Sequence, residues 1–484
     1  PEEAKPEALL LVGNAERQLG KTDEAEKYYR LLIEKYPSRE EAKDARYQRL
    51  INVYNTDPSA LIAQVDDFLK TSPTPERADQ AKLLKAEALY KQQNYAEAAP
   101  VYEELRASQL SPKLRAEAAY KLGWCYIQLK DTARVIEAFS YLIKAFPDNP
   151  QGASALVQRA HAYQESKNLE AAIGDLNSLI ANYPNAKERE AAFQQKALLL
   201  GELGRDKEMA QTFQQLLKEY PKTAAAAQAN YFIGKTAFDA RDYKRAIAPL
   251  DNARRLDRAQ YYELATSRIL LCYFQQHDRK AATREADAAL AANEASSVLP
   301  DVLYWLGVEY YNDKNLPLAD KYFTALGEKE TKGDVKPDFW FYLGDVATRE
   351  KNFEKAESAY SSYLQVSTDA AGKAKAMLAL GATKISANKP DDAEKIANEI
   401  MQMQPEGKVN AEARLLAGDA QFARQHFAEA GKAYSSVALL YDDPAITPRA
   451  LDLAQESYRR AGMQAEAERV GKQLRERFPN YVRS

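Results

Sequence analysis

Residues 116–147 read AEAAYKLGWCYIQLKDTARVIEAFSYLIKAFP, and this stretch decides the fold. Apolar residues recur every three or four positions over residues 119–126 and again over residues 135–143, with a polar stretch between the two runs. This spacing is typical of a pair of amphipathic helices. Proline cannot continue a helix, so the aromatic-proline pair Phe146-Pro147 predicts the end of the second helix.

The same pattern returns along the chain about every 37 residues. A small residue marks the first helix of most repeats, and these residues are Gly13, Ala86, Gly123, Ala160, Ala197, Gly234, Gly307, Gly344, Gly381 and Gly418. A fixed period of this size is typical of a solenoid of stacked helix pairs. The repeats begin seven residues earlier, at Pro6, Ala42, Asp79, Ala116, Ala153, Glu190, Ala227, Glu263, Pro300, Pro337, Ala374, Ala411 and Pro448. We therefore expect an all-α protein of about thirteen helix-turn-helix repeats.

The repeat from Ala116 resembles the tetratricopeptide repeat, through Leu122-Gly123, Tyr126, Phe139 and Pro147. The resemblance implies a right-handed α-solenoid. The usual repeat of the family has 34 residues, so the three extra residues are expected to lengthen the helix ends or the turn between repeats. The longer repeat and the aromatic-proline ends resemble bacterial cell-envelope members, such as the outer-membrane assembly lipoprotein and the Tol-Pal coordinator. That resemblance implies a periplasmic scaffold, and a cytoplasmic location is the alternative.

Residues 1–5 are interpreted as the end of a linker or tether, and residues 6–484 as one continuous solenoid. Two repeats break the pattern. Arg49 and Leu270 stand where a small residue is expected, so the repeats at 42–78 and 263–299 are irregular. They are either hinges or rigid, degenerate repeats. As hinges, they would separate blocks at residues 6–78, 79–262 and 263–484.

The charge balance of the chain argues against a nucleic-acid partner. It has 67 basic and 70 acidic residues and a formal net charge of −3, so no strong field attracts nucleic acid or an anionic membrane. No apolar run approaches the length of a membrane span. Membrane association is therefore expected only through a missing anchor or a membrane-protein partner. The chain begins at Pro1 without a methionine, so we expect that it was processed or trimmed.

Residues suited to enzyme chemistry are few and scattered. His161, His277 and His426 lie in distant repeats without a second ligand at helical spacing, so we expect no metal, no cofactor and no catalytic residues. Cys125 and Cys272 both hold the tenth position of their repeats, four repeats apart. Their Cα atoms should be much farther apart than the roughly 7 Å that a disulfide tolerates. They are predicted to stay free and to fill the core.

A curved array of helix pairs leaves a concave surface that the first helices line. The resemblance places the second, fifth, ninth and twelfth residues of each repeat on this groove. Those positions are rich in aromatic residues, namely Tyr90, Tyr120, Trp124, Tyr231, Phe238, Phe274, Tyr304, Tyr311, Phe341 and Phe422. Aromatic side chains are favoured binding anchors because they bury much area with little loss of rotamer freedom. The alternative is that several of them only pack against the next repeat.

Chaperone co-factors of the family hold a C-terminal carboxylate with Asn, Lys and Arg side chains at the fifth and ninth positions. Among the ninth positions Asn14 is the only asparagine, and its neighbour does not fit, so a carboxylate clamp is not expected in the groove. Asp345 and Asp419 hold ninth positions near the C-terminus and favour basic or polar groups of a partner.

These features predict a non-enzymatic scaffold or adaptor in a bacterial envelope assembly. It would bind one or more proteins, or a peptide segment, along the aromatic groove. One alternative is a structural spacer whose copies join as a homo-oligomer. The other is a polysaccharide-export helper whose groove contacts glycan, because aromatic rings serve that purpose equally well.

Overall fold

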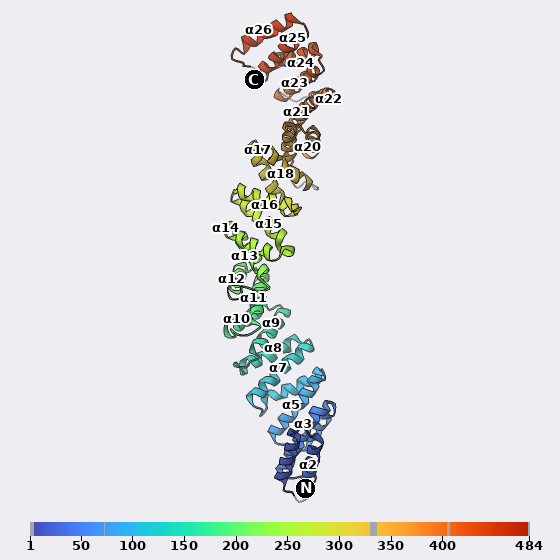
Figure 1. The fold of residues 1–484 in the computed structure, drawn as a ribbon, viewed down its shortest axis with the longest axis vertical. Coiled ribbons are helices and arrows are strands. Elements are labelled where there is room, and N and C mark those ends of the chain that lie inside the picture. The colour runs from blue at the N-terminus through green and yellow to red at the C-terminus, as the bar shows by residue number, and fades with distance from the viewer. Residues whose placement is uncertain (1–3, 72, 330–335, 404–406, 483–484) are drawn as a thin grey trace. The chain divides into compact units, whose positions relative to one another are not determined.

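A computed structural model describes residues 4–71, 73–329, 336–403 and 407–482, and all regular structure within these ranges is helical. Twenty-six α-helices and two short 3₁₀-helices follow one another in these ranges, and within each half of the chain most consecutive α-helices pack against each other. The expected α-solenoid of helix pairs is therefore confirmed. The chain forms two compact halves, Pro1–Ala240 and Arg241–Ser484, which Figure 1 colours from blue to green and from green to red.

Helices alternate in the N-terminal half between the first and the second helix of each repeat. The first helices are α1 (Pro6–Gln18), α3 (Glu40–Thr56), α5 (Pro75–Lys91), α7 (Pro112–Gln128), α9 (Gly152–Glu165), α11 (Arg189–Glu202) and α13 (Ala226–Asp239). The second helices are α2 (Thr22–Lys35), α4 (Pro58–Lys70), α6 (Tyr95–Glu104, followed by the 3₁₀-helix η1, Leu105–Ala107), α8 (Thr132–Ala145), α10 (Leu169–Asn182) and α12 (Asp206–Glu219).

The C-terminal half continues the alternation, beginning with a second helix. Its second helices are α14 (Tyr243–Leu256), α16 (Arg279–Ala291, followed by η2, Ala295–Ser297), α18 (Leu316–Lys329), α20 (Phe353–Val366), α22 (Pro390–Gln402), α24 (Phe427–Leu440) and α26 (Gln464–Arg477). Its first helices are α15 (Arg258–Gln275), α17 (Pro300–Asn312), α19 (Asp338–Arg349), α21 (Ala370–Ser386), α23 (Gly407–Ala423) and α25 (Thr447–Arg460).

The extra residues of each repeat are used in two ways. In α7 they lengthen the helix to 17 residues, with Pro112 in its first turn and the Ser111 hydroxyl accepting a hydrogen bond from the Leu114 amide. The next first helix, α9, has 14 residues and follows a longer turn over residues 146–151. Of the predicted linker at residues 1–5, only residues 4 and 5 lie within the described ranges.

In every repeat except that of α3 and α4, the turn between the two helices contains one residue with a positive φ angle. Three of these residues are Gly20, Gly204 and Gly462, for which this conformation carries no steric cost. The others are Gln93, Lys130, Lys167, Arg241, His277, Lys314, Lys351, Asn388 and Gln425, so the same turn recurs with ordinary side chains. The turn backbone is thus set by the two packed helices and not by glycine alone.

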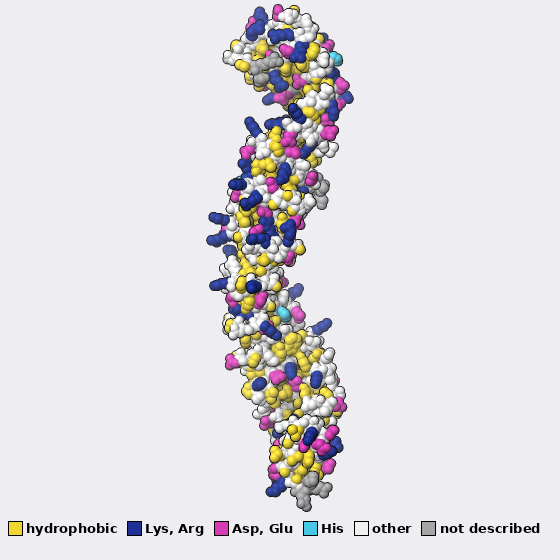
Figure 2. Space-filling model, in the orientation of Figure 1, with side chains coloured by type: hydrophobic (Ala, Val, Ile, Leu, Met, Phe, Trp, Pro, Cys, Tyr) yellow, Lys and Arg dark blue, Asp and Glu magenta, His cyan; other side chains and the backbone are white. Residues whose placement is uncertain are grey.

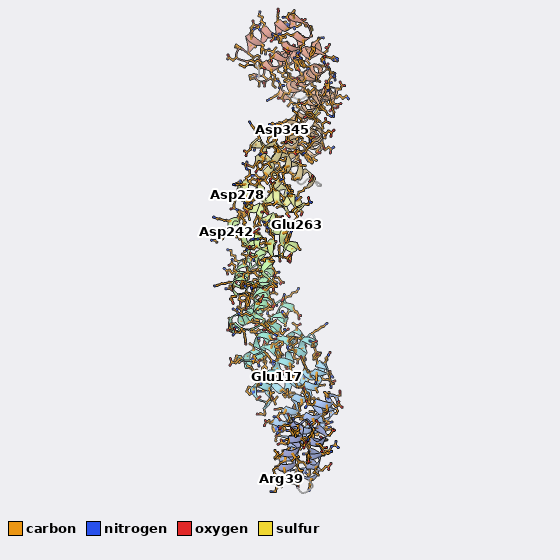
Figure 3. All side chains as sticks on the ribbon, viewed as in Figure 1. Arg39, Glu117, Asp242, Glu263, Asp278 and Asp345 are labelled. Atoms are coloured by element: carbon orange, nitrogen blue, oxygen red, sulfur yellow. The ribbon has the colours of Figure 1, made fainter. Side chains whose placement is uncertain are left out.

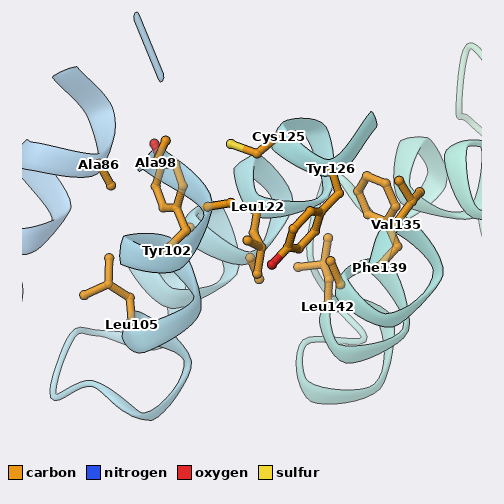
Figure 4. Close-up of a cluster of buried hydrophobic side chains, with 14 of the residues drawn as sticks. Ala86, Ala98, Tyr102, Leu105, Leu122, Cys125, Tyr126, Val135, Phe139 and Leu142 are labelled. Atoms are coloured by element: carbon orange, nitrogen blue, oxygen red, sulfur yellow. The ribbon is translucent and has the colours of Figure 1, made fainter. Parts of the chain in front are cut away.

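The core of a repeat is built on a ring that lies against a glycine 16 residues earlier in the sequence. A Cβ atom added to Gly123 would lie 2.5 Å from the Phe139 ring, so only glycine permits this approach. Figure 4 shows the Phe139 ring among the buried side chains of this core, with Leu122 and Leu142. Four further pairs show the same contact, namely Gly13–Tyr29, Gly307–Phe323, Gly344–Tyr360 and Gly418–Tyr434. These five glycines are therefore sites of close approach between the two helices of a repeat, whereas a Cβ atom on Gly381 would meet Leu416 of the next repeat.

The two irregular repeats replace this pair by a large residue followed by a smaller one. Val65 stands sixteen residues after Arg49, and Ala286 stands sixteen residues after Leu270. Val65, Leu270 and Ala286 are fully buried. The order of sizes is reversed in both repeats, and in the second one the large residue, Leu270, is enclosed in the core. The division of the chain into three blocks with hinges at these repeats stays a prediction, whereas contacts divide the chain between Ala240 and Arg241.

Candidate functional site

The twelve residues predicted to line the groove all lie on first helices. Eleven of them are half-buried, and Tyr231 is buried with 8% of its surface exposed. They occur on α5, α7 and α13 in the N-terminal half and on α15, α17, α19 and α23 in the C-terminal half. We call the half-buried ones the aromatic face, namely Tyr90, Tyr120, Trp124, Phe238, Phe274, Tyr304, Tyr311, Phe341 and Phe422, with Asp345 and Asp419 beside them.

Tyr120 and Trp124 form the centre of this face in the N-terminal half. They lie one turn apart on α7, their ring centroids are 6.2 Å apart, and the rings meet edge to face at 73°. The Tyr120 hydroxyl is 2.9 Å from Oγ of Ser154, which lies on the next first helix, α9. The pair therefore joins two neighbouring repeats and leaves part of both rings exposed.

Two hollows lie along α9, the first helix that follows α7. One, of about 430 Å³, lies at the start of α9 and is lined by Pro150, Ala153, Ser154, Tyr183, Pro184, Asn185, Ala186, Lys187 and Glu188. The other, of about 470 Å³, is lined by Tyr126, Ile127, Lys130, Thr132, Val135, Gln158, His161, Ala162 and Glu165. Ser154 and His161 are seven residues apart, which is roughly 10 Å along a helix. Figure 2 shows hydrophobic side chains gathered at the level of α7 and α8.

Uncharged amide side chains continue the contacts between first helices beyond α9. Gln194 on α11 donates from Nε2 to Oε1 of Gln228 on α13 at 2.8 Å, and Gln195 donates to Oε1 of Gln164 at 3.2 Å. Sequence reasoning missed these residues, together with Ser154. The signal was a spacing of 34 or 31 residues between polar side chains, which places them on neighbouring repeats.

The aromatic face of the C-terminal half includes a chain of contacts from α15 to α19. Phe274 meets Trp305 edge to face at 5.2 Å, and Tyr311 meets Tyr342 at 4.9 Å. The Tyr311 hydroxyl donates to Oδ2 of Asp345 at 2.7 Å. Burial and this carboxylate raise the pKa of Tyr311 to about 12.

Both acidic residues of the face have partners within the protein. Asp345, labelled in Figure 3, accepts from Tyr311 and lies 2.8 Å from Nε of Arg349. Asp419 accepts a hydrogen bond of 2.7 Å from the Tyr434 hydroxyl, and burial raises the pKa of the Asp419 carboxyl above its ordinary value. These partners reduce the negative charge that the face offers to a ligand.

Cations lie over several of the exposed ring surfaces. Lys375 lies 4.9 Å from the ring centroid of Phe341, and Lys336 lies 5.6 Å from that of Tyr304. The Arg460 guanidinium lies 4.9 Å from the ring centroid of Phe422. Such contacts contribute about 0.5–1 kcal/mol at exposed sites. The rings thus pack within the protein and contact cations, and they stay half-buried.

Cys125 and Cys272 are free and fully buried, as predicted, and burial raises the pKa of each thiol to about 12. Within the described ranges, no three His, Cys, Asp or Glu residues are grouped so that they could hold a metal ion. Among the helices of those ranges, none combines the length and the apolar composition needed to cross a membrane.

Stacked helix pairs with a small residue at each close contact define the class of α-solenoid repeat proteins. Family models of the tetratricopeptide repeat match residues 83–150 and residues 7–39, 154–186 and 191–223. These four segments all lie in the N-terminal half, and together they support the tetratricopeptide repeat family.

No curated protein matches the chain. Among solved structures, Naa15/Naa10 bound to HypK is similar, with 14% identity, a TM-score of 0.38, and coverage of 90% of this chain and 68% of that one. A tetratricopeptide repeat protein from Parabacteroides merdae has 12% identity, a TM-score of 0.26, and coverage of 70% and 98%. PilF from Pseudomonas aeruginosa has 19% identity, a TM-score of 0.30, and coverage of 45% and 93%.

Proposed function

We propose that this protein is a non-enzymatic scaffold that binds an extended segment of a partner protein along the aromatic face. The repeat architecture supports a protein–protein interaction role, because stacked repeats create long surfaces for binding. The observation that carries the proposal is the half-buried, edge-to-face Tyr120–Trp124 pair, which contacts α9, the helix along which two hollows of about 430 and 470 Å³ lie. Hollows of this size lie within the range of sites that accept a side chain or small ligand.

The chemistry of the face indicates the kind of segment that would bind. Ile127 and Val135 give the second hollow an apolar lining, while Gln158 and His161 offer polar atoms beside it. A bulky apolar side chain would fill the hollow, and the backbone on either side of it would find hydrogen-bonding partners. Aromatic anchors flanked by polar groups are typical of energetic hot spots in interfaces.

The proposal extends to a bacterial envelope assembly, with the protein located in the periplasm. Its support is the sequence resemblance in the aromatic-proline helix ends and the longer repeat. Fractionation of the native host tests this part, because recovery in the cytoplasm alone would contradict it.

The binding proposal is tested with Trp124→Ala and Tyr304→Ala, one in each half of the chain. Each variant is expected to keep its helical circular dichroism and to lose at least about tenfold in affinity for a partner captured from the native host. Tyr28→Ala is the matched control, because Tyr28 is a half-buried aromatic residue on the second helix α2. Retained affinity in both variants would contradict the proposal. Unfolding of a variant would instead show that the substituted ring belongs to the core.

A second candidate, self-association, is favoured by the exposed face of α1. Leu11 and Leu19 are 70% and 68% exposed, and Ala8 and Ala15 are exposed beside them. The equivalent residues of α7 are Ala118 and Cys125, and both of them are buried. Light scattering tests this candidate. Self-association requires that oligomers form as the protein concentration rises and that the Leu11→Gln variant does not form them.

A further inference from the structure

The irregular repeat of α3 and α4 contains a hollow that has no part in the aromatic face. Its volume is about 310 Å³, at the lower end of the range of ligand pockets. Its walls come from the second helices α2 and α4 and from α3, and it is lined by Ile33, Arg46, Arg49, Leu50, Gln64, Asp67, Phe68 and Thr71. The residues of the aromatic face, in contrast, lie on first helices alone.

The reversed pair of this repeat accounts for the arginine in the wall of the hollow. Arg49 occupies the position that glycine holds in Gly123–Phe139, and Val65 replaces the ring. The Arg49 side chain turns to α2, where Nε and Nη2 lie 2.8 and 2.7 Å from Oε1 of Glu26. Leu50 and Phe68, which are only 3% and 5% exposed, supply an apolar lining.

Positive charge exceeds negative charge around the hollow. Glu26 is shared by Arg49 and Arg30, and Asp67 is paired with Lys70 at 2.8 Å. Arg46 donates through Nη1 and Nη2 to the Pro37 carbonyl at 3.3 and 3.2 Å, and it forms no ion pair with any described residue. One half-buried guanidinium therefore lies beside an apolar surface without a carboxylate to neutralise it.

We propose that this hollow binds a carboxylate carried on an apolar group the size of one amino-acid side chain. The carboxylate would pair with Arg46, whose contact with the Pro37 carbonyl already fixes its position, and the apolar group would lie against Leu50 and Phe68. A guanidinium recognises a carboxylate through charge-assisted, often bidentate hydrogen bonds. The same chemistry is offered by a free small carboxylic acid and by the last residue of a polypeptide.

Isothermal titration calorimetry of the full chain with N-acetyl-leucine tests the site, with N-acetyl-leucinamide as the uncharged counterpart. N-acetyl-leucine is expected to bind, and the amide to bind at least about tenfold more weakly. Arg46→Met should cause a similar loss, since it removes the charge and keeps the length of the side chain. Arg245→Met is the matched control, because Arg245 is an 85% exposed arginine on α14, and it should leave binding unchanged.

Gln64→Trp provides a second test that removes no buried contact. Gln64 is an exposed lining residue of α4, and an indole there is expected to fill the hollow and block binding while the circular dichroism is retained. Equal binding of acid and amide would overturn the proposal. So would the absence of binding by every acid, or unchanged binding in both Arg46→Met and Gln64→Trp.

Two further ligands distinguish the sources of the carboxylate. The first is a peptide that ends in leucine. If it binds at least tenfold more tightly than N-acetyl-leucine, and if C-terminal amidation abolishes this gain in affinity, the site is assigned to a chain terminus. Octanoate that binds as tightly as this peptide assigns it to free acids. The aromatic face is tested separately through Trp124, so failure of either site leaves the other standing.

Discussion

A glycine that faces an aromatic ring leaves no space for even one added carbon atom. In the Gly344–Tyr360 pair, a Cβ atom would lie 2.7 Å from Cε1 of Tyr360 and 2.8 Å from Cδ1. The ring belongs to a fully enclosed side chain, 1% exposed, and cannot move away without disturbing α20. The two helices of the repeat must therefore separate to accept a larger residue.

We predict that Gly344→Ala destabilises the protein by about 1–3 kcal/mol, the usual cost of overpacking a core. Urea denaturation followed by circular dichroism measures the loss. Gly174→Ala is the matched control, since Gly174 lies in α10 with nothing within 4 Å of an added Cβ atom. Alanine is the better helix former by about 1 kcal/mol, so this variant should be more stable than the original protein. Equal effects of the two substitutions would contradict the contact.

The two thiols give a prediction that depends on pH. Burial raises the pKa of Cys125 and of Cys272 to about 12, so the reactive thiolate is scarce near neutral pH. A thiol-specific reagent such as Ellman's reagent is expected to react with neither residue in the folded protein at pH 8, and with both in guanidinium chloride. Rapid reaction of the folded protein would show that the helices that carry the thiols, α7 and α15, open readily. The Cys125→Ala variant identifies which thiol reacts.

At the scale of helices, the local sequence predicted where second helices end but not how their turns are formed. The aromatic-proline pairs work because proline ends a helix by its own chemistry, and α8 does stop at Ala145, just before Phe146-Pro147. The left-handed residue of each turn could not be predicted from lysine or glutamine, which rarely favour that conformation. It is imposed by the packing of the helices on both sides, as at Lys130 and Gln425.

The reversed pair Leu270–Ala286 offers a test of size complementarity between paired helices. Both residues are fully buried, on α15 and α16. Leu270→Gly alone should leave a cavity and Ala286→Phe alone should overpack the repeat, so each is expected to destabilise the protein by more than 1 kcal/mol. The double variant recreates the arrangement of Gly307 and Phe323.

The double variant is therefore expected to be more stable than the two single effects predict, with a coupling energy of about 0.5–3 kcal/mol in urea melts. Strict additivity would mean that the two residues do not share one contact. Gly344→Ala combined with Ala286→Phe serves as the control pair, since these two positions belong to different repeats.

At the scale of the whole molecule, each repeat contacts mainly its neighbours, so stability is distributed along the chain. We predict that Gly344→Ala lowers amide protection in α19 and α20 and in the helices next to them, and leaves α5–α12 unchanged. Hydrogen exchange with mass spectrometry measures this helix by helix. A uniform loss of protection over both halves would indicate one cooperative structure.

The candidate site could be predicted from the sequence less completely than the fold. The period placed every aromatic residue of the face on a first helix, because repeat position determines helix and orientation together. Asp345 and Arg349 stand four residues apart on α19, so their ion pair follows from helical spacing alone. The 34-residue spacing places Tyr120 and Ser154 on neighbouring repeats, but whether the two side chains meet depends on how the stacked helices bring them within hydrogen-bonding distance. The hollow beside Arg46 likewise arises from a departure from the repeat and not from the repeat itself.

The sixteen-residue separation between a glycine and its ring has a kinetic consequence. Because each repeat closes its core over so short a stretch, the chain has a low contact order, and little loop-closure entropy is lost before the first contacts form. A nascent chain could complete one hairpin soon after it leaves the ribosome and use it as the surface on which the next one docks. Synthesis from the N-terminus would then build the array in the order in which its repeats are stacked.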